Sequence, residues 1–179
     1  PNMWEWVAAT IGIQRAGGVM VPLNTRLKGG EVADMVRRGK ISRLFAIGDF
    51  LGQYYPAMLR GEDMPGLRQR IGLRGRPDQL GPGEQTWDDF IARSGQTDDA
   101  VLAAREAGVT PETLADIMFT SGTTGLPKGA LFDHRRTLAG GWAWATISRQ
   151  NSDDRYCAFG PFSHTGSYKL GWVSGLLSG

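Results

Sequence analysis

Residues 116 to 129 have the sequence Asp116-Ile117-Met118-Phe119-Thr120-Ser121-Gly122-Thr123-Thr124-Gly125-Leu126-Pro127-Lys128-Gly129. The first four residues form a short, mainly apolar run, which predicts a buried strand. The following residues combine hydroxyl side chains, glycines and one lysine, with Leu126 as the only bulky apolar side chain. Glycines let backbone N–H groups point inward, hydroxyls donate hydrogen bonds, and a lysine carries a full positive charge. A strand followed by this loop predicts a binding site for a polyanion.

The loop differs from a Walker A motif, which needs four residues between its glycines and a Ser or Thr directly after Gly-Lys. Here Gly122 and Gly125 are three positions apart, and Pro127 stands before Lys128. Composition alone would also fit a Gly/Ser/Thr-rich surface turn after a strand. The proline and the lysine in register make such a chance match rare.

The loop resembles the signature loop of the adenylate-forming superfamily, which contains acyl-CoA synthetases, aryl-CoA ligases, luciferases and peptide-synthetase adenylation domains. Every fixed position of the pattern Thr-Ser-Gly-Thr-Thr-Gly-x-Pro-Lys-Gly is matched. The resemblance implies that backbone N–H groups, hydroxyls and the lysine of this loop hold the β- and γ-phosphates of ATP. The residues assigned to ATP in this way are Thr120, Ser121, Gly122, Thr123, Thr124, Gly125 and Lys128.

Composition places the chain among ordinary globular proteins. Its 179 residues allow a sizeable core, and it is 41% hydrophobic and 21% charged. The net charge is only +2 and the arginines are interleaved with acids, so we expect no nucleic-acid partner. The sequence has no signal peptide and no apolar stretch of the roughly 18 residues that a membrane helix needs. We therefore expect a cytoplasmic protein without an integral membrane segment.

The single cysteine, Cys157, excludes an internal disulfide, and its apolar neighbours predict a buried, unreactive thiol. Two histidines are too few for a histidine-rich metal site, so the sequence leaves metal ligands unknown. The chain begins at Pro1 without a methionine, and neither end has the run of polar residues that is typical of a free terminus. We expect it to be part of a longer protein.

Helical and strand-like periodicities alternate along the chain, which predicts an α/β fold with a mostly parallel sheet flanked by helices. The expected helices cover residues 4–16, 31–38, 49–59, 86–94, 133–148 and 168–177, with a further helix start at 110–112. The expected strands cover residues 19–22, 44–47, 69–73, 116–119 and 155–160. Segment 95–108 is predicted to be a polar connection, and the whole chain to be one domain or part of one.

Specific residues mark the ends and faces of these helices. The first helix is predicted to be amphipathic from the spacing of Trp4, Val7, Ala8, Ile11 and Arg15, and Gly17-Gly18 ends it. Asp49, Thr86 and Asp133 are predicted N-caps, and Thr110-Pro111-Glu112 is a helix-start signal with proline at the first helical position.

A second motif, Gly160-Pro161-Phe162-Ser163-His164-Thr165-Gly166, follows the expected strand at 155–160. The carboxyl end of a strand is where open α/β sheets place ligand groups. Taken alone, His164 fits a loop histidine bonded to backbone better than a ligand group. In acyl- and aryl-CoA ligases, however, a similar motif follows the phosphate loop, and its histidine lines the acyl pocket near the carboxylate. The resemblance implies this role for His164 and Gly166, although Ser163 shifts the register.

The same segment bears on the substrate. Peptide-synthetase adenylation domains tend to have Phe-Asp-x-Ser here, and the aspartate pairs with the substrate amino group. No acid lies between Gly160 and Gly179, so a carboxylic acid without an amine is expected. An amino-acid adenylation domain fragment is the alternative inside the superfamily. A non-catalytic phosphate- or nucleotide-binding α/β module is the alternative outside it.

The resemblance is densest over residues 6–26 and 116–171. The segments Asn24-Thr25-Arg26 and Asp49-Phe50-Leu51-Gly52, with Tyr168-Lys169 after His164, look like actinobacterial fatty-acid–CoA ligases. Some of those enzymes act on propanoate side chains of sterol-ring fragments. His134 also matches a frequent family histidine, but its place beside Asp133 at a helix start fits a structural role equally well.

The resemblance implies that residues 1–179 are a fragment of the N-terminal AMP-binding domain of an acyl-CoA synthetase-like enzyme, without the C-terminal small domain. The implied reaction has two steps: a carboxylate attacks the α-phosphorus of Mg-ATP, and the thiol of coenzyme A then displaces AMP from the acyl-adenylate. ATP, Mg²⁺ and coenzyme A are the implied cofactors, a small carboxylic acid is the partner, and a homo-oligomer is compatible with this interpretation. The chain lacks the adenine, ribose, hinge and C-terminal lysine motifs, so we assign no catalytic residue. We expect no ligase activity from it alone, and exposed apolar surface.

Overall fold

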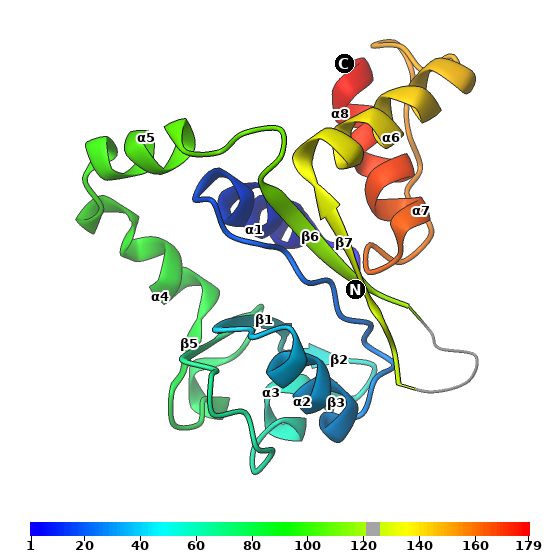
Figure 1. Cartoon of the computed structure of the whole chain (residues 1–179). Coiled ribbons are helices and arrows are strands. Elements are labelled where there is room, and N and C mark those ends of the chain that lie inside the picture. The colour runs from blue at the N-terminus through cyan, green and yellow to red at the C-terminus, as the bar shows by residue number, and fades with distance from the viewer. Residues whose placement is uncertain (121–125) are drawn as a thin grey trace. The chain divides into compact units, whose positions relative to one another are not determined.

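A computed structural model describes residues 1–120 and 126–179 (Figure 1). It confirms the predicted α/β class, with helices and a parallel sheet. The chain divides into two compact units, which we describe separately. Unit 1 contains residues 1–25 and 105–179, and unit 2 contains residues 26–104.

Unit 2 is built on a three-stranded parallel sheet in the order β1-β4-β5. Its elements are α2 (Gly29–Arg38), β1 (Arg43–Ile47), β2 (Asp49–Phe50), β3 (Gln53–Tyr54), α3 (Tyr55–Met58), β4 (Gln69–Leu73), η1 (Pro77–Gln79), β5 (Glu84–Thr86), α4 (Trp87–Ala92) and η2 (Ser94–Gln96). Val36, Ile71 and Leu73 are among its buried side chains. The expected strands at 44–47 and 69–73 and the helix at 31–38 are confirmed.

The predicted helix over residues 49–59 is wrong. Asp49–Phe50 and Gln53–Tyr54 form the antiparallel hairpin β2–β3 instead, and helix α3 begins only at Tyr55. Leu51 and Gly52 have φ angles of 52° and 75°, which fit the two-residue turns that match the twist of paired strands. The Asp49 carboxylate caps no helix and pairs with Arg76 at 3.1 Å.

Helix α4 begins as predicted. The Thr86 hydroxyl accepts a hydrogen bond from the Asp89 N–H at 3.0 Å and donates one to the Asp89 carboxylate at 2.6 Å. The first contact satisfies a backbone donor at the helix start, and the second holds the Thr86 hydroxyl in place.

Segment 95–108 is not the predicted polar connection, because it contains helix α5 (Asp99–Ala107). The Asp98 carboxylate accepts from the Ala100 N–H at 2.8 Å and so caps its start. The helix start predicted at 110–112 is also wrong. There the Thr113 N–H donates to the Thr110 carbonyl at 3.0 Å, and this turn leads directly into a strand.

Unit 1 is organised around an antiparallel strand pair. Its elements are α1 (Trp4–Arg15), β6 (Leu114–Phe119), β7 (Gly129–Asp133), α6 (His134–Ile147), α7 (Thr165–Ser167), the π-helical segment η3 (Tyr168–Val173) and α8 (Ser174–Ser178). Strand β6 is the predicted strand at 116–119, whereas β7 was not predicted. Asp133 caps α6 as expected, because its carboxylate accepts from the Arg136 N–H at 2.7 Å.

Two predictions near the start of unit 1 need correction. The expected strand at 19–22 is reduced to one parallel bridge between Met20 and Asp116. Pro22 has no N–H to extend that ladder. Helix α1 ends at Arg15, one residue before the predicted end, and its buried side is not the one that the apolar spacing indicates, since Trp4 and Ile11 are exposed while Glu5 and Thr10 are buried.

The strand predicted at 155–160 is absent: these described residues have no regular secondary structure. Cys157 is exposed rather than buried, and Phe159 is 94% exposed. The segment pairs with no strand in the part of the chain that the structure describes, so no neighbouring strand shields its apolar side chains.

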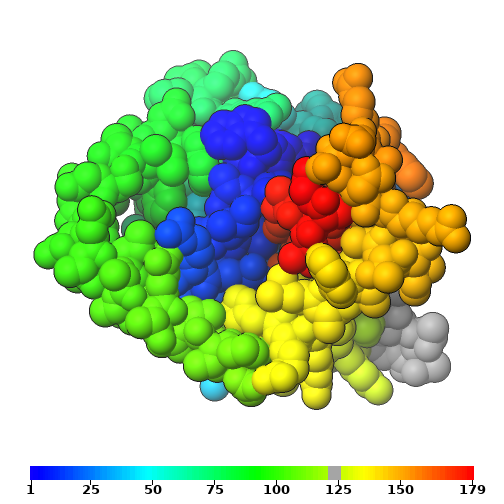
Figure 2. Space-filling view, turned by 90° about the horizontal axis from the view of Figure 1, so that it is seen from above, coloured from blue at the N-terminus to red at the C-terminus, as the bar shows by residue number. Residues whose placement is uncertain are grey.

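Residues 165–178 are helical, in agreement with the prediction for 168–177, but the helix is irregular. Its central part η3 has π-type hydrogen bonding, and Gly171 has non-helical angles of φ −100° and ψ −106°. Figure 2 shows this C-terminal segment in red beside α6 in yellow and the N-terminal residues in blue. Unit 1 exposes the large apolar side chains Trp142, Ile147 and Leu176, as expected. Within the described residues no helix has the length and apolar character to cross a bilayer.

Candidate functional site

The β6–β7 hairpin presents both ends of the predicted phosphate loop. The two strands pair from Leu114 opposite Asp133 to Phe119 opposite Gly129. Beyond the last pair, the Thr120 N–H donates to the Lys128 carbonyl at 2.9 Å. The hairpin therefore fixes the distance between the two ends of the loop. Five predicted ligands of ATP lie outside the described residues: Ser121, Gly122, Thr123, Thr124 and Gly125.

Thr120 and Lys128 have different surroundings. The Thr120 hydroxyl donates to the Lys128 carbonyl at 3.3 Å, so it braces the hairpin. The Lys128 side chain is exposed, and no carboxylate of residues 1–120 or 126–179 pairs with it. A solvated ammonium at the mouth of the loop is available to an anion.

Gly129 is required where the loop returns to the sheet. A Cβ at this position would lie 2.9 Å from Cγ2 of Ile117 on the facing strand. Real Cβ atoms do not approach so closely, and the Ile117 side chain is held in the pair. Any larger residue would push β7 away from β6 and move Lys128 with it.

His164 is exposed and lies at the N-terminus of α7, where its Nδ1 accepts from the Gly166 N–H at 3.2 Å. A nitrogen that accepts carries no proton, so the neutral imidazole bears its hydrogen on Nε2. Nε2–H is a donor that can bind a carboxylate oxygen. Gly166 contributes the backbone N–H that selects this tautomer.

The loop before His164 is held by Asn2 from the other end of the sequence. The Asn2 amide donates to the carbonyls of Ala158 and Gly160, at 3.1 and 2.7 Å, and accepts from the Phe162 N–H at 2.9 Å. Gly160 is confined too, because a Cβ there would lie 2.1 Å from Oγ of Ser167. These contacts give the His164 segment a fixed path without a strand.

A cluster of aromatic side chains packs against the His164 segment. Trp6 packs against Phe162 and Tyr168 with ring centroids 5.4 Å apart in both cases, and Trp172 stacks on Tyr168 at 5.3 Å. The Tyr168 hydroxyl accepts from the Gln14 side chain at 2.9 Å. Burial raises the pKa of Tyr168, so this hydroxyl stays protonated.

A buried ion pair joins strand β6 to the segment η3. The Lys169 ammonium is 2.9 Å from Oδ1 of Asp116, and Oδ2 of Asp116 accepts from the Thr137 hydroxyl at 3.0 Å. The Asp116 side chain is wholly buried and that of Lys169 is 4% exposed. Burial raises the pKa of Asp116, and the contacts with Lys169 and Thr137 oppose that rise. Burial likewise lowers the pKa of Lys169, and Asp116 opposes this.

His134 and possible metal ligands are the remaining candidates for the site. His134 is the first residue of α6, where it is half-buried and its Nε2 contacts no polar partner in the described part of the chain. No group of three or more His, Cys, Asp or Glu residues that could hold a metal occurs among the described residues.

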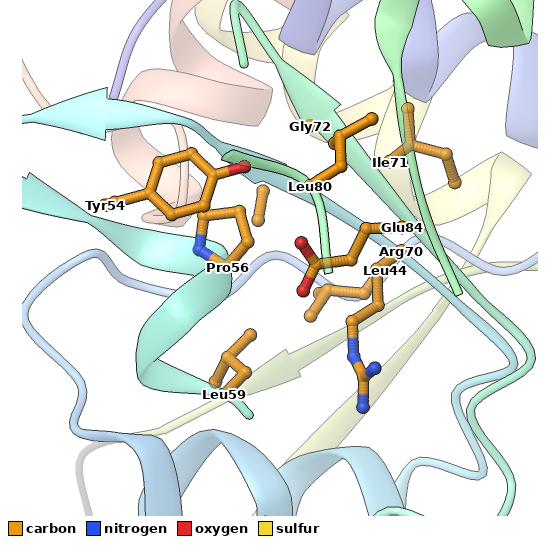
Figure 3. Close-up of a pocket in the computed structure, with 10 residues that line it drawn as sticks. Leu44, Tyr54, Pro56, Leu59, Arg70, Ile71, Gly72, Leu80 and Glu84 are labelled. Atoms are coloured by element: carbon orange, nitrogen blue, oxygen red, sulfur yellow. The ribbon is translucent and has the colours of Figure 1, made fainter. Parts of the chain in front are cut away.

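A cavity in unit 2 is too small for an acyl substrate. Figure 3 shows the Tyr54 hydroxyl and the Glu84 carboxylate pointing into it, among Leu44, Pro56, Leu59 and Leu80. It has about 10 Å³ of room, which matches a single water molecule. This cavity is therefore excluded as an acyl pocket, and the loop and the His164 motif of unit 1 stay the candidate site predicted from the sequence.

A family model described as "AMP-binding enzyme" matches residues 1–179, which is the whole chain. The chain belongs to the AMP-binding enzyme family. This confirms the resemblance to adenylate-forming enzymes that the loop and the His164 motif indicate.

Curated relatives of the family are acid–CoA ligases. The chain is 42% identical over its full length to a 7a-methyl-1,5-dioxo-octahydro-1H-inden-4-yl-propanoyl:CoA ligase of Mycobacterium tuberculosis, of which it covers 34%. It is 40% identical to the ligase of the same name from Rhodococcus jostii, of which it covers 35%. The chain thus spans about a third of the length of these relatives.

Solved structures of the AMP-binding family have the same fold. An acetoacetyl-CoA synthetase from Streptomyces lividans matches all of this chain with a TM-score of 0.73 at 22% identity, and the match covers 27% of that protein. The anthranilate CoA ligase AuaEII, in complex with anthranoyl-AMP, matches 81% of this chain with a TM-score of 0.65 at 26% identity, and the match covers 26% of that protein.

The structure also shows what motif reading missed in this AMP-binding chain. Asn2 binds the loop before His164, and Asp116 pairs with Lys169 in the core; none of the three was predicted to make these contacts. A signal existed for the last two, because each is a single charge within an apolar element. Their partnership could not be found locally, since the two residues are 53 positions apart.

Proposed function

We propose that the protein, at the full length of its relatives, is an AMP-forming acid–CoA ligase that converts a carboxylic acid to its acyl-adenylate and then to its CoA thioester. The observation that carries this proposal is the β6–β7 hairpin. It ends in the family's phosphate-loop sequence and presents the exposed ammonium of Lys128 beside that loop.

The loop is assigned to the departing pyrophosphate. Negative charge grows on the β- and γ-phosphates as the carboxylate attacks, and fixed donors with a nearby cation stabilise that charge. Lys128 supplies the cation, and residues 121–125 are proposed to supply hydroxyl and N–H donors. Thr120 sits at the edge of the site, where its hydroxyl holds the loop closed.

Magnesium would enter with ATP in this proposal. Mg²⁺ in such sites keeps several waters and binds substrate phosphates with one or two carboxylates. The described residues contain no cluster of acids that could hold it alone. In this proposal Lys128 contacts the phosphates, and the ligands of Mg²⁺ stay unassigned.

His164 is assigned to the carboxylate end of the acyl pocket, with Gly166 beside it. Its Nε2–H is free to donate to a carboxylate oxygen because Nδ1 accepts from Gly166. Such an N–H donor would hold one carboxylate oxygen and so orient the other toward phosphorus. The absence of an acid from residues 160–179 favours a substrate without an amine.

The substrate class is proposed to be a fatty or cyclic alkanoic acid. Two relatives are named for a propanoyl group on a bicyclic octahydroindene ring, so that class is the first to test. Residues 1–179 are proposed to be part of the N-terminal AMP-binding domain, with the C-terminal small domain further along a longer protein. This chain alone is expected to form no acyl-AMP. A cytoplasmic location and a homo-oligomer stay predictions.

Pyrophosphate release by a full-length protein that carries this chain tests the proposal. Release should require ATP together with a carboxylic acid, and the octahydroindenyl propanoic acid should exceed straight-chain fatty acids and amino acids. Release that depends on an amino acid would favour an amino-acid adenylation domain. ATP binding without any acid-dependent release would favour a non-catalytic nucleotide-binding module.

The Lys128→Met variant tests the assignment of the loop. Loss of one such charge should reduce kcat/KM for ATP by about 100-fold. Lys28→Met is the matched control, because Lys28 is an exposed lysine of unit 2 and should leave kcat/KM unchanged. Equal rates in both variants would contradict the assignment.

A further inference from the structure

The buried Asp116–Lys169 ion pair connects the two parts of the candidate site. Asp116 lies on β6, four residues before Thr120 at the base of the loop. Lys169 lies in η3, five residues after His164. We propose that this pair is a positioning device that fixes the phosphate loop relative to the acyl-pocket histidine. The inference rests on the proposed function and names the residues that align its two substrates.

The connection is short and stiff at each step. From the loop it follows β6, whose ladder to β7 is continuous from Asp116 to Phe119. It crosses one ion pair of 2.9 Å. From Lys169 it follows a single turn, in which the N–H groups of Ser167 and Tyr168 donate to the His164 carbonyl at 3.1 and 3.0 Å. A shift of Lys169 relative to Asp116 would therefore move His164 relative to the loop.

The surroundings fix the pair in one geometry. Thr137 on α6 holds the second oxygen of Asp116 at 3.0 Å. The Lys169 ammonium lies 3.2 Å from the centroid of the Phe132 ring, which is a favourable position for a cation over an aromatic face. Strand β6, strand β7, helix α6 and η3 each contribute one side chain. The pair thus links four elements at one point.

Stability alone does not account for the pair. Taking two charges out of water is costly, and well-packed apolar residues of similar volume often serve a core equally well. The ion pair sets a short distance between two particular atoms, whereas an apolar contact tolerates sliding. Asp116 stands in a strand whose other buried residues, Ala115 and Met118, are apolar. The charges are better explained by a need for fixed alignment.

The backbone around Lys169 gives an independent reason. Lys169 lies in the π-helical segment, and Gly171 two residues later departs from helical angles. Two helical stretches meet in a kink at Gly171, and sharp kinks inside helices are uncommon. The same element thus combines an uncommon backbone with a buried charge.

The test compares variants that separate alignment from stability. The double variant D116N/K169M removes both charges at nearly constant volume, and the amide oxygen at position 116 can still accept from Thr137. It should melt within about 5 °C of the wild type, because no unpaired charge is left in the core. In the full-length protein its kcat for acid-dependent pyrophosphate release should fall at least about 10-fold, since misplacement by 1 Å can cost 100-fold.

A matched control removes the ion pair of unit 2. R60M/E84Q neutralises Arg60 and Glu84, which are 2.7 Å apart and have no place in the proposed site. This variant should leave kcat unchanged. A wild-type melting temperature and a wild-type kcat in D116N/K169M would overturn the proposal and leave the pair a structural contact only.

Hydrogen exchange on the full-length protein gives a readout that needs no ligase activity. In D116N/K169M the amides of Thr120 and Tyr168 should exchange at least about 10-fold faster, while the Val32 amide of α2 should not change. Unchanged exchange at both site amides would overturn the proposal whether or not the protein is a ligase. Failure of the wild-type protein to release pyrophosphate would instead overturn the proposed function.

Thr137→Val is the second variant, for the case that the double variant does not fold. It keeps both charges and frees only Oδ2 of Asp116. Faster exchange at Thr120 and Tyr168 and an approximately 3-fold lower kcat should follow, because the loss of one hydrogen bond relaxes the pair. No change in either quantity in a folded T137V would contradict the proposal.

Discussion

Units 1 and 2 each contain a carboxylate paired with a basic side chain, and the two pairs differ in their access to water. In unit 2, Glu84 binds Arg60 at 2.7 Å, and the arginine side chain is 40% exposed. In unit 1, the side chains of Asp116 and Lys169 are 0% and 4% exposed. The Glu84 side chain is itself only 2% exposed. The pair of unit 2 therefore joins a buried carboxylate to a partly exposed arginine, whereas both partners of the pair in unit 1 are buried.

The largest effect should come from breaking the buried pair on one side. Lys169→Met should lower the free energy of unfolding of unit 1 by about 3–5 kcal/mol, because Asp116 would be left charged and unpaired in the core. Arg60→Met should have a smaller effect on unit 2, because the Gly81 N–H still binds the Glu84 carboxylate at 2.8 Å. Urea unfolding, followed by a probe in each unit, measures both. Equal losses of unfolding free energy in the two units would contradict the difference proposed between the two pairs.

A pair of glycine variants sharpens the comparison at the backbone. Gly129→Ala should destabilise unit 1 by about 1–3 kcal/mol, because its Cβ would overlap the Ile117 side chain. Gly30→Ala should stabilise unit 2 by about 0.5 kcal/mol, since its nearest neighbour is 4.0 Å away and alanine favours a helix. Thermal melts of the two variants should move in opposite directions. Melts that move together would contradict this account of the hairpin.

Helix caps should behave alike in both units, because capping is local. Thr86→Ala removes the cap of α4, and Asp133→Ala removes the cap of α6. Each should cost about 1 kcal/mol of folding free energy. Chemical denaturation of the two variants checks this. A much larger loss for Asp133→Ala would show that this residue does more than cap.

The smallest predicted effect is the loss of thermal stability at low pH. Burial alone would raise the pKa of Glu84, but the contacts with Arg60 and the Gly81 N–H outweigh it and hold the pKa below the ordinary 4.5. A carboxyl group with a lowered folded pKa stabilises the protein above its unfolded pKa and loses that contribution as the pH falls through the folded pKa. Below about pH 4.5 the melting temperature of the wild type should therefore fall further than that of Glu84→Gln. Parallel pH profiles would exclude this contribution.

Sequence reasoning succeeded where structure depends on neighbours in the chain. Thr86 and Asp133 act on backbone groups three residues away, so their caps could be predicted. The helix predicted after Asp49 failed because Leu51 adopts a left-handed angle, which a leucine seldom does. The strand predicted at 155–160 failed because apolar content does not supply a partner strand.

The candidate site could be predicted in part for the same reason. The loop at 120–128 and the motif at 160–166 are contiguous, and their residue types indicate their chemistry. The contacts that align them are not contiguous. Asn2 holds Phe162 from 160 positions away, and Lys169 meets Asp116 across 53. Only the folded chain shows these partners.

The fate of the substrate carboxylate oxygen tests the central claim most directly. A full-length protein that carries this chain is given ATP, coenzyme A and a carboxylic acid labelled with ¹⁸O in the carboxylate, and the nucleotide product is analysed by mass spectrometry. If the carboxylate attacks the α-phosphorus, one labelled oxygen must appear in AMP, and unlabelled pyrophosphate must be released. Label in inorganic phosphate together with ADP, or AMP without label, would contradict the account.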